Sequence, residues 1–180
     1  MATTTKIIFS GFGGQGVLTL GQVVADIALS QGKEVTWMPS YGAEMRGGTA
    51  NCSVIISDSV IGSPIILSNI DILCAMNQPS VTKFLEKTRE GAKVFINSSI
   101  VTEPVTKDDA EIIAIDASNI AVKAGNARTA NMVMMAGFLQ KTGLFTIDEL
   151  EEALTRRFTG KKELVDVNMK AIKEGLEALA

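Results

Sequence analysis

The feature that most constrains the fold lies near the start of the chain, where an apolar run meets four closely spaced glycines. The run Ile7-Ile8-Phe9 is typical of a buried β-strand, and an apolar-periodic segment follows the glycines. The glycines are Gly11, Gly13, Gly14 and Gly16. A strand, a tight turn and a helix in this order predict an α/β fold with a mostly parallel sheet.

The spacing of Gly11, Gly13 and Gly16 fits the pattern G-x-G-x-x-G. Such a turn lets the backbone approach a phosphate, which the N–H groups and positive dipole end of the helix then favour. A turn that only packs a helix on a strand has the same pattern. A dinucleotide site needs an acidic residue at the end of the second strand, and the segment Glu34–Met38 ends without one. The pattern therefore favours a phosphate-bearing ligand over a nicotinamide dinucleotide.

Composition excludes several functional classes. The chain has 180 residues, of which 46% are hydrophobic and 21% charged, as in one globular domain. A net charge of −3 and 5% aromatic residues give no footprint for nucleic acid. Apolar runs are too short to cross a membrane, and the first residues lack the apolar core of a signal peptide. We therefore expect a cytoplasmic protein.

Residues that usually carry redox or hydrolytic chemistry are missing. The chain has no histidine, which is the commonest general base and metal ligand. Its two cysteines, Cys52 and Cys74, lie in separate apolar runs and are expected to be buried thiols, not a disulfide. Without a C-x-x-C motif the chain cannot hold an iron–sulfur cluster in the usual spacings. We expect no catalytic residue and no metal site in this chain, which would work beside another.

A second motif, Ser40-Tyr-Gly-Ala-Glu-Met-Arg-Gly-Gly48, lies in the predicted loop Pro39–Asn51. It combines Tyr41, Glu44 and Arg46 with the glycines Gly47 and Gly48. Loops at the carboxyl ends of strands carry many binding residues, so we expect this loop to line a crevice beside the glycine turn. The alternative is a turn in which Glu44 and Arg46 are only solvated.

The middle of the chain predicts further strands and one helix. Cys52–Ser57 and Val60–Ile66 flank Asp58-Ser59 and predict a β-hairpin. Pro79 begins a predicted helix that runs to Arg89 and ends at Gly91. Asn77 and Asn97 follow two strands as turn formers or as crevice-facing side chains. The strands outside the hairpin are expected at residues 34–38, 71–76, 93–97 and 111–116.

The last third of the chain is predicted to be helical. Asn126, Arg128 and Asn131 form a polar cluster before an apolar helix at 132–139, which we expect to be buried centrally and not at an interface. Thr146 and Glu149 fit a capping box, and a final helix is expected at 161–179. The C-terminal helices, about 146–180, would cover the sheet or form a dimer surface.

Taken together, Gly11–Gly16, Ser40–Gly48 and the pair Gly125-Asn126 with Asn131-Met132 resemble the gamma subunit of 2-oxoacid:ferredoxin oxidoreductases. The resemblance spans residues 5–180 and implies a single domain, 1–180, with a Rossmann-like three-layer fold, a mostly parallel sheet and one β-hairpin. It implies alpha and beta partner subunits, with a delta subunit in some members. These partners carry thiamine diphosphate, Mg²⁺ and iron–sulfur clusters, and the complex forms acyl-CoA and reduces ferredoxin. The Tyr-Gly-x-Glu-x-Arg-Gly-Gly form resembles the 2-oxoglutarate and branched-chain members more than the pyruvate members.

The family also suggests that this domain lines the approach for coenzyme A. Our hypothesis is that the N–H groups of Gly13, Gly14, Gln15 and Gly16 donate to a phosphate of coenzyme A and that the Arg46 guanidinium adds charge. Glu44 would orient Arg46. A stand-alone phosphate- or nucleotide-binding module is the alternative. The predicted binding residues are Gly11, Gly13, Gly14, Gln15, Gly16, Tyr41, Glu44, Arg46, Gly47, Gly48, Asn126 and Asn131.

Overall fold

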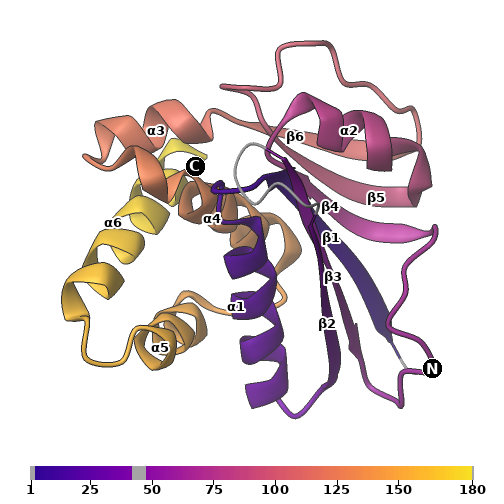
Figure 1. Cartoon of the computed structure of the whole chain (residues 1–180), viewed down its shortest axis with the longest axis horizontal. Coiled ribbons are helices and arrows are strands. Elements are labelled where there is room, and N and C mark those ends of the chain that lie inside the picture. The colour runs from indigo at the N-terminus through magenta and orange to yellow at the C-terminus, as the bar shows by residue number, and fades with distance from the viewer. Residues whose placement is uncertain (1–2, 42–47, 180) are drawn as a thin grey trace.

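The computed structural model describes residues 3–41 and 48–179, with only the backbone described at Tyr41. They build a six-stranded sheet in the order β2-β3-β1-β4-β5-β6 (Figure 1). β1, β4, β5 and β6 pair in parallel, and β3 runs antiparallel to both of its neighbours, β1 and β2. β2 thus has the direction of β1, and the predicted mostly parallel sheet is confirmed. The strands are β1 (Thr4–Phe12), β2 (Glu34–Tyr41), β3 (Thr49–Ser57), β4 (Ile70–Ala75), β5 (Thr88–Asn97) and β6 (Ala110–Ile115).

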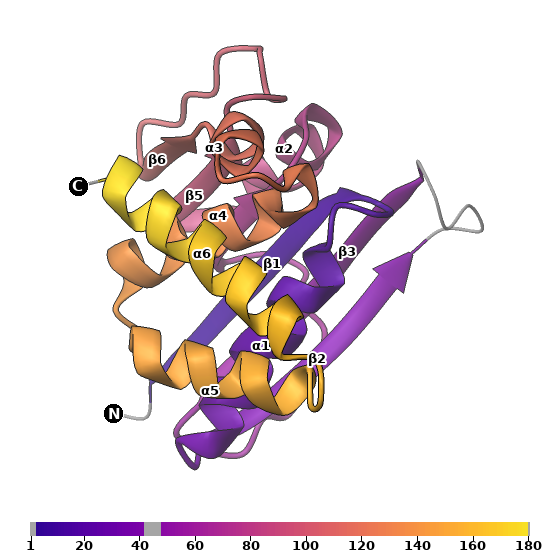
Figure 2. The ribbon, with the colours of Figure 1, turned by 90° about the vertical axis from the view of Figure 1, so that its left-hand side faces the viewer.

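Helices cover both faces of the sheet, which confirms the predicted three-layer α/β fold. Figure 1 shows α2 on one side of the sheet and α1, α4, α5 and α6 on the other. In Figure 2 the C-terminal helices α5 and α6 lie outside α1 and α4. The helices are α1 (Val17–Ser30), α2 (Gln78–Phe84), α3 (Ala117–Lys123), α4 (Ala130–Thr142), α5 (Ile147–Arg157) and α6 (Lys162–Ala178), with short 3₁₀ turns η1 (Leu85–Lys87) and η2 (Ala127–Thr129).

Helix α4 is the centre of the larger core. Every residue from Asn131 to Leu139 is buried, which confirms the predicted central burial of this apolar helix. The Phe138 ring lies 5.6 Å from that of Phe9 in β1 and 5.9 Å from that of Phe145, measured between centroids. On its outer side α4 approaches α6 so closely that a Cβ at Gly175 would lie 2.8 Å from the Ala136 Cβ. Helix α6 therefore packs on the sheet through α4, whereas α5 packs beside α1.

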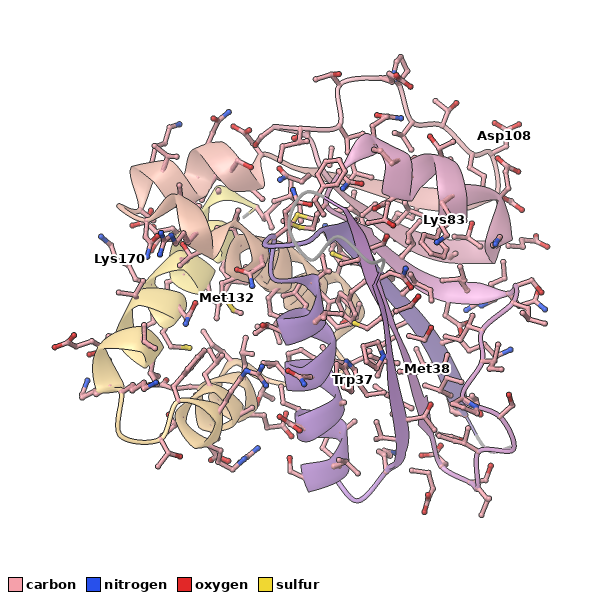
Figure 3. The ribbon with its side chains drawn as sticks, in the orientation of Figure 1. Trp37, Met38, Lys83, Asp108, Met132 and Lys170 are labelled. Atoms are coloured by element: carbon pink, nitrogen blue, oxygen red, sulfur yellow. The ribbon has the colours of Figure 1, made fainter. Side chains whose placement is uncertain are left out.

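Helix α1 packs on β1, β2 and β3 through a continuous apolar face. Its inner residues, among them Val17, Leu20, Val24 and Ala28, are buried. Gly32 follows the end of the helix with a φ of +76°, and its N–H donates to the Leu29 carbonyl at 3.0 Å. Trp37 lies on the side of β2 that faces α1, and Met38 lies on the other side (Figure 3).

Two further local predictions are confirmed. The N–H of Glu149 donates to Thr146 Oγ1 at 3.2 Å, while the N–H of Thr146 donates to Glu149 Oε2 at 2.7 Å, which completes the capping box of α5. Cys52 in β3 and Cys74 in β4 are buried free thiols. Each residue lies opposite Phe9 of β1, on either side of it, so β1 separates the two cysteines.

None of the described helices combines the length and apolar character that crossing a membrane requires.

The predicted hairpin around Asp58-Ser59 is wrong. β3 ends at Ser57, and residues 58–69 run irregularly to β4 with Val60, Ile65 and Leu67 exposed. β3 already has a partner on each side, so no edge of it can take a second arm. The segment has the β-branched residues that are common in strands, but it has no neighbouring strand with which to form a hydrogen-bonded ladder. The hairpin of this fold is instead formed by β2 and β3.

Two predicted element ends are also corrected. Pro39 does not end the second strand but lies inside β2, opposite Cys52. β2 is at the edge of the sheet, where a residue without an N–H can face away from the ladder. The helix after Pro79 ends at Phe84 and not at Arg89, because β5 begins at Thr88. Gly91, predicted as a helix cap, has a φ of +73° within β5, near the irregular register between β4 and β5.

The contact of α1 with the sheet depends on the missing side chain of Gly21. A Cβ there would lie 2.3 Å from the buried Cys52 Sγ and 3.1 Å from Trp37 Nε1. We expect Gly21→Ala to lower the free energy of unfolding by about 2 kcal/mol through overpacking. Urea unfolding followed by the fluorescence of Trp37, the only tryptophan, measures it. Gly62→Ala is the control, because a Cβ there meets nothing within 4 Å. Equal midpoints for both variants would contradict this packing.

Burial raises the pKa of the Cys52 and Cys74 thiols from 9.0 to about 12. Above pH 9 the unfolded chain loses these protons while the folded chain keeps them, so stability present below pH 9 is lost as the pH rises. We expect the free energy of unfolding to fall by about 1 kcal/mol for each thiol between pH 9 and pH 10. Cys74→Ala should remove half of this thiol-dependent fall, as measured by urea unfolding at each pH. Identical pH dependence in the variant would refute the assignment.

Candidate functional site

The glycine turn lies at the carboxyl end of β1 and leads directly into α1. The turn is closed by the Gln15 N–H, which donates to the Phe12 carbonyl at 3.1 Å. Gly14 and Gly16 have φ angles of +100° and +75°, which side chains disfavour. Gly16 occupies the N-cap of α1, where no side chain caps the helix. Within the described residues, no side chain therefore caps the first N–H groups of α1.

The structure brings the second motif to the same place through Gly48. The Gly13 N–H donates to the Gly48 carbonyl at 2.8 Å. Next to this bond, Phe12 pairs with Thr49 and Gly11 with Ala50 across the β1–β3 ladder. Tyr41 ends β2 with its backbone paired to Ala50, whereas Glu44, Arg46 and Gly47 lie outside the described residues.

A hollow of 380 Å³ lies against the turn. Its apolar lining comes from Phe12, Val17, Leu18 and Ala50, and the backbone of three glycines completes the wall: Gly13, Gly14 and Gly16. A hollow of this kind can take an apolar part of a ligand while the N–H groups at the helix start take an anionic part.

Two of the four N–H groups in the hypothesis are already bonded within the chain. The N–H of Gly13 donates to the Gly48 carbonyl and that of Gln15 to the Phe12 carbonyl. The N–H groups of Gly14 and Gly16 make no hydrogen bond within residues 3–41 and 48–179. Within the described residues, the turn therefore has fewer N–H groups left for a ligand than the hypothesis assumed.

The Gln15 side chain lies beneath the turn and not in the hollow. Its Oε1 accepts the Phe12 N–H at 2.6 Å, and its Nε2 donates to the Met76 carbonyl at 3.3 Å. A Cβ on Gly11 would lie 2.6 Å from this Oε1 and 2.9 Å from the Met76 Cβ. The first glycine of the motif thus makes room for Gln15 and Met76, and not for a ligand.

Of the two asparagines predicted to bind a ligand, Asn131 contacts the glycine turn, whereas Asn126 caps the nearby turn η2. Asn131 is buried, and its Nδ2 donates to the Gly16 carbonyl at 3.4 Å. Asn126 Oδ1 accepts the N–H of Arg128 at 3.0 Å and starts η2. The Arg128 side chain is exposed.

Asn77 and Asn97 form turns, as one of the two interpretations of them predicted. Asn77 Oδ1 accepts the Ser80 N–H at 2.9 Å and caps α2, while Asn97 Oδ1 accepts the Ser99 N–H at 3.3 Å. The sequence did not reveal that Asn77 also lies beside Gln15. The N-cap signal Asn-Gln-Pro is local, whereas Asn77 and Gln15 are 62 positions apart in the chain.

A protein-family model matches nearly the whole chain. Residues 6–178 match the model described as pyruvate ferredoxin/flavodoxin oxidoreductase. The chain belongs to this family. Its resemblance to gamma subunits of 2-oxoacid:ferredoxin oxidoreductases, inferred from the two glycine motifs, is confirmed.

Relatives of known name match nearly the whole chain. The ketoisovalerate oxidoreductase subunit VorA of Methanothermobacter thermautotrophicus is 37% identical over 174 residues, which are 96% of this chain and 36% of the relative. The chain thus spans about a third of the VorA sequences it matches. The common gamma subunit of the pyruvate/ketoisovalerate oxidoreductases of Thermococcus litoralis is 30% identical and is matched over 96% of this chain and 95% of the relative.

Solved structures share the fold. The gamma subunit of the keto/oxoacid ferredoxin oxidoreductase of Geobacter sulfurreducens has a TM-score of 0.80 at 30% identity and matches over 96% of both chains. The 2-oxoglutarate:ferredoxin oxidoreductase of Magnetococcus marinus has a TM-score of 0.85 at 23% identity, covering 98% of this chain and 32% of that one. The second likeness shows the fold alone.

The two turn glycines with a positive φ, Gly14 and Gly16, differ in their surroundings. A Cβ on Gly14 meets nothing within 4 Å, whereas a Cβ on Gly16 would lie 2.4 Å from Asn131 Nδ2. We expect Gly14→Ala to cost about 1–2 kcal/mol of stability from its backbone alone, and Gly16→Ala to cost about 1–3 kcal/mol more through the clash. Adding Asn131→Ala should recover part of the loss in the Gly16 variant only, as measured by urea unfolding. Equal effects in both backgrounds would exclude the contact.

Proposed function

We propose that this chain is the gamma-type subunit of a 2-oxoacid:ferredoxin oxidoreductase, a complex that converts a 2-oxoacid and coenzyme A into acyl-CoA and CO₂ while it reduces ferredoxin. The observation that carries this proposal is the end-to-end match with separate gamma subunits. The chain covers 95% of the Thermococcus gamma subunit and 96% of the Geobacter one. The VorA relatives support the same assignment for a domain inside a longer chain.

The chemistry of oxidation belongs to the partners in this proposal. An iron–sulfur cluster needs several thiolates around one point, and the chain has only Cys52 and Cys74, buried on the two sides of Phe9. These residues do not fit a cluster, and the chain has no histidine. Alpha and beta subunits, with or without a delta subunit, would carry thiamine diphosphate, Mg²⁺ and the clusters. The complex would work in the cytoplasm.

The glycine turn is the proposed contribution of this chain to the coenzyme A path. Coenzyme A carries phosphates, and the turn presents the N–H groups of Gly14 and Gly16 with the uncapped start of α1 beside an apolar hollow. The Magnetococcus protein of the same fold was solved with 2-oxoglutarate, coenzyme A and succinyl-CoA bound, which supports this choice of ligand. In this proposal the chain binds and orients coenzyme A, and Arg46 adds positive charge.

For the 2-oxoacid we propose a branched-chain acid or 2-oxoglutarate. The second motif resembles those members, and the relatives include VorA at 37% identity and 2-oxoglutarate synthase subunits KorC at 31–32% identity. Turnover of 2-oxoisovalerate, 2-oxoglutarate and pyruvate by the reconstituted complex ranks the three. A clear preference for pyruvate would refute this part of the proposal.

The alternative is a stand-alone phosphate- or nucleotide-binding module, which the uncapped helix start and the hollow also permit. Affinity purification separates the two. A subunit should bring down chains that contain thiamine diphosphate and iron–sulfur clusters, and it should show no turnover of 2-oxoacid alone. Tight nucleotide binding by the isolated chain, with no companion chains, would favour the module.

The role of Arg46 is testable in the assembled complex. We expect Arg46→Ala to raise the KM for coenzyme A about tenfold or more, because a charge-assisted contact to phosphate is worth about 1.5–3 kcal/mol. The KM for the 2-oxoacid should stay the same. Arg156→Ala is the matched control, because Arg156 in α5 forms an exposed ion pair with Glu152 at 3.6 Å. An unchanged KM for coenzyme A in the Arg46 variant would remove this residue from the site.

A further inference from the structure

A closed set of hydrogen-bonded polar side chains connects the glycine turn with α2 on the opposite face of the sheet. Ser10 Oγ, from β1, donates to Ser80 Oγ at 2.8 Å. Ser80 Oγ donates to Asn77 Oδ1 at 2.6 Å, and Asn77 Nδ2 lies 3.5 Å from Gln15 Oε1. Gln15 Oε1 then accepts the Phe12 N–H at 2.6 Å, which returns the chain of bonds to β1.

Three of the four side chains in this set are buried, and the fourth, Gln15, is half-buried. Ser10 and Ser80 are each 4% exposed, and Asn77 is 1% exposed. Each of these groups loses its bonds to water on burial, so each needs its partner in place. The set also includes the Met76 carbonyl, which accepts Gln15 Nε2 at 3.3 Å. The ends of β1 and β4 are therefore fixed to each other through the Gln15 side chain.

The glycine turn is held by the Gln15 side chain and by two further hydrogen bonds. The Gly13 N–H is bonded to Gly48 at 2.8 Å, and the Gly16 carbonyl is bonded to Asn131 at 3.4 Å. Neither bond involves Gln15. If Gln15 sets the path of the backbone between Phe12 and Gly16, its loss will weaken these two bonds as well.

We propose that Gln15 is the positioning residue of the glycine turn and that Asn77 fixes the orientation of its carboxamide. Asn77 offers its N–H group to Gln15 Oε1, so Nε2 of Gln15 faces Met76 and Oε1 faces Phe12. This arrangement fixes the backbone of Gly14 and Gly16, which lines the hollow. For ligand binding the inference depends on the proposed coenzyme A site, but for the turn itself it does not.

Three variants test this inference. Gln15→Met keeps the length of the side chain and removes its hydrogen bonds. Asn77→Asp keeps the cap of α2, since aspartate is an equally good N-cap, but it turns the donor facing Gln15 into an acceptor. Gln31→Met is the matched control. Gln31 donates to the Leu144 carbonyl at 3.2 Å and to Glu149 Oε1 at 2.9 Å, at the other end of α1.

The first measurement is amide hydrogen exchange of the full chain by NMR. We expect Gln15→Met to accelerate exchange of the Gly13 N–H about tenfold, as for the loss of a contact worth about 1.4 kcal/mol. Asn77→Asp should accelerate it less, and in the Gln15→Met background it should add nothing, because both act through the same side chain. Gln31→Met should leave it unchanged. An unchanged rate in Gln15→Met, or equal acceleration throughout β1 and α1, would overturn the inference.

The second measurement is steady-state kinetics of the assembled complex. We expect Gln15→Met to raise the KM for coenzyme A about fivefold to tenfold with kcat at saturation and the KM for the 2-oxoacid unchanged. This split supports positioning of the ligand site, because a general loss of stability would lower the active fraction and therefore kcat. If Gly13 exchange accelerates while the KM for coenzyme A stays the same, the inference about the turn is supported and the proposed coenzyme A site is the part that fails.

Discussion

The pairing of β3 with both β1 and β2 is the constraint on which the rest of this structure depends. β3 runs antiparallel between β1 and β2, which share a direction. Its pairing with β1 extends from Thr4 opposite Ser57 to Phe12 opposite Thr49. Its first residues therefore stand beside the last residues of β1. This places Gly48 against Gly13, although they are 35 positions apart. Without β3 in this position, the two glycine motifs would belong to different parts of the surface.

The same pairing explains why a glycine pattern known from dinucleotide-binding proteins serves another purpose here. In those proteins the strand after the first helix lies directly beside the first strand, and its end carries the acid that binds the ribose. In this chain α1 also leads to a strand of the same direction, but β3 separates that strand from β1. The end of β2 is thus displaced from the helix start by one strand. The missing acidic residue and the inserted strand are two independent reasons against a nicotinamide cofactor.

The sequence predicts well those features that depend on neighbouring residues, and less well those that depend on pairing. The first helix, the capping box of α5 and the buried apolar helix α4 follow from local spacing and composition. The segment Val60–Ile66 has strand composition, but only the sheet order shows that no edge is open to it. At the site, the turn is visible in the glycines, whereas the bonds that occupy the N–H of Gly13 and the side chain of Gln15 join residues 35 and 61 positions apart.

The central burial of α4 has a consequence for how a ligand is received. Asn131, which contacts the Gly16 carbonyl, stands at the start of a helix whose next eight residues are all buried, so it cannot move without disturbing the core. In the proposed site, the backbone that Asn131 contacts would therefore be in place before a ligand binds. Association would then need little ordering of this side of the site, which would leave more of the contact energy for affinity. The same rigidity would make this side discriminate against ligands of another shape.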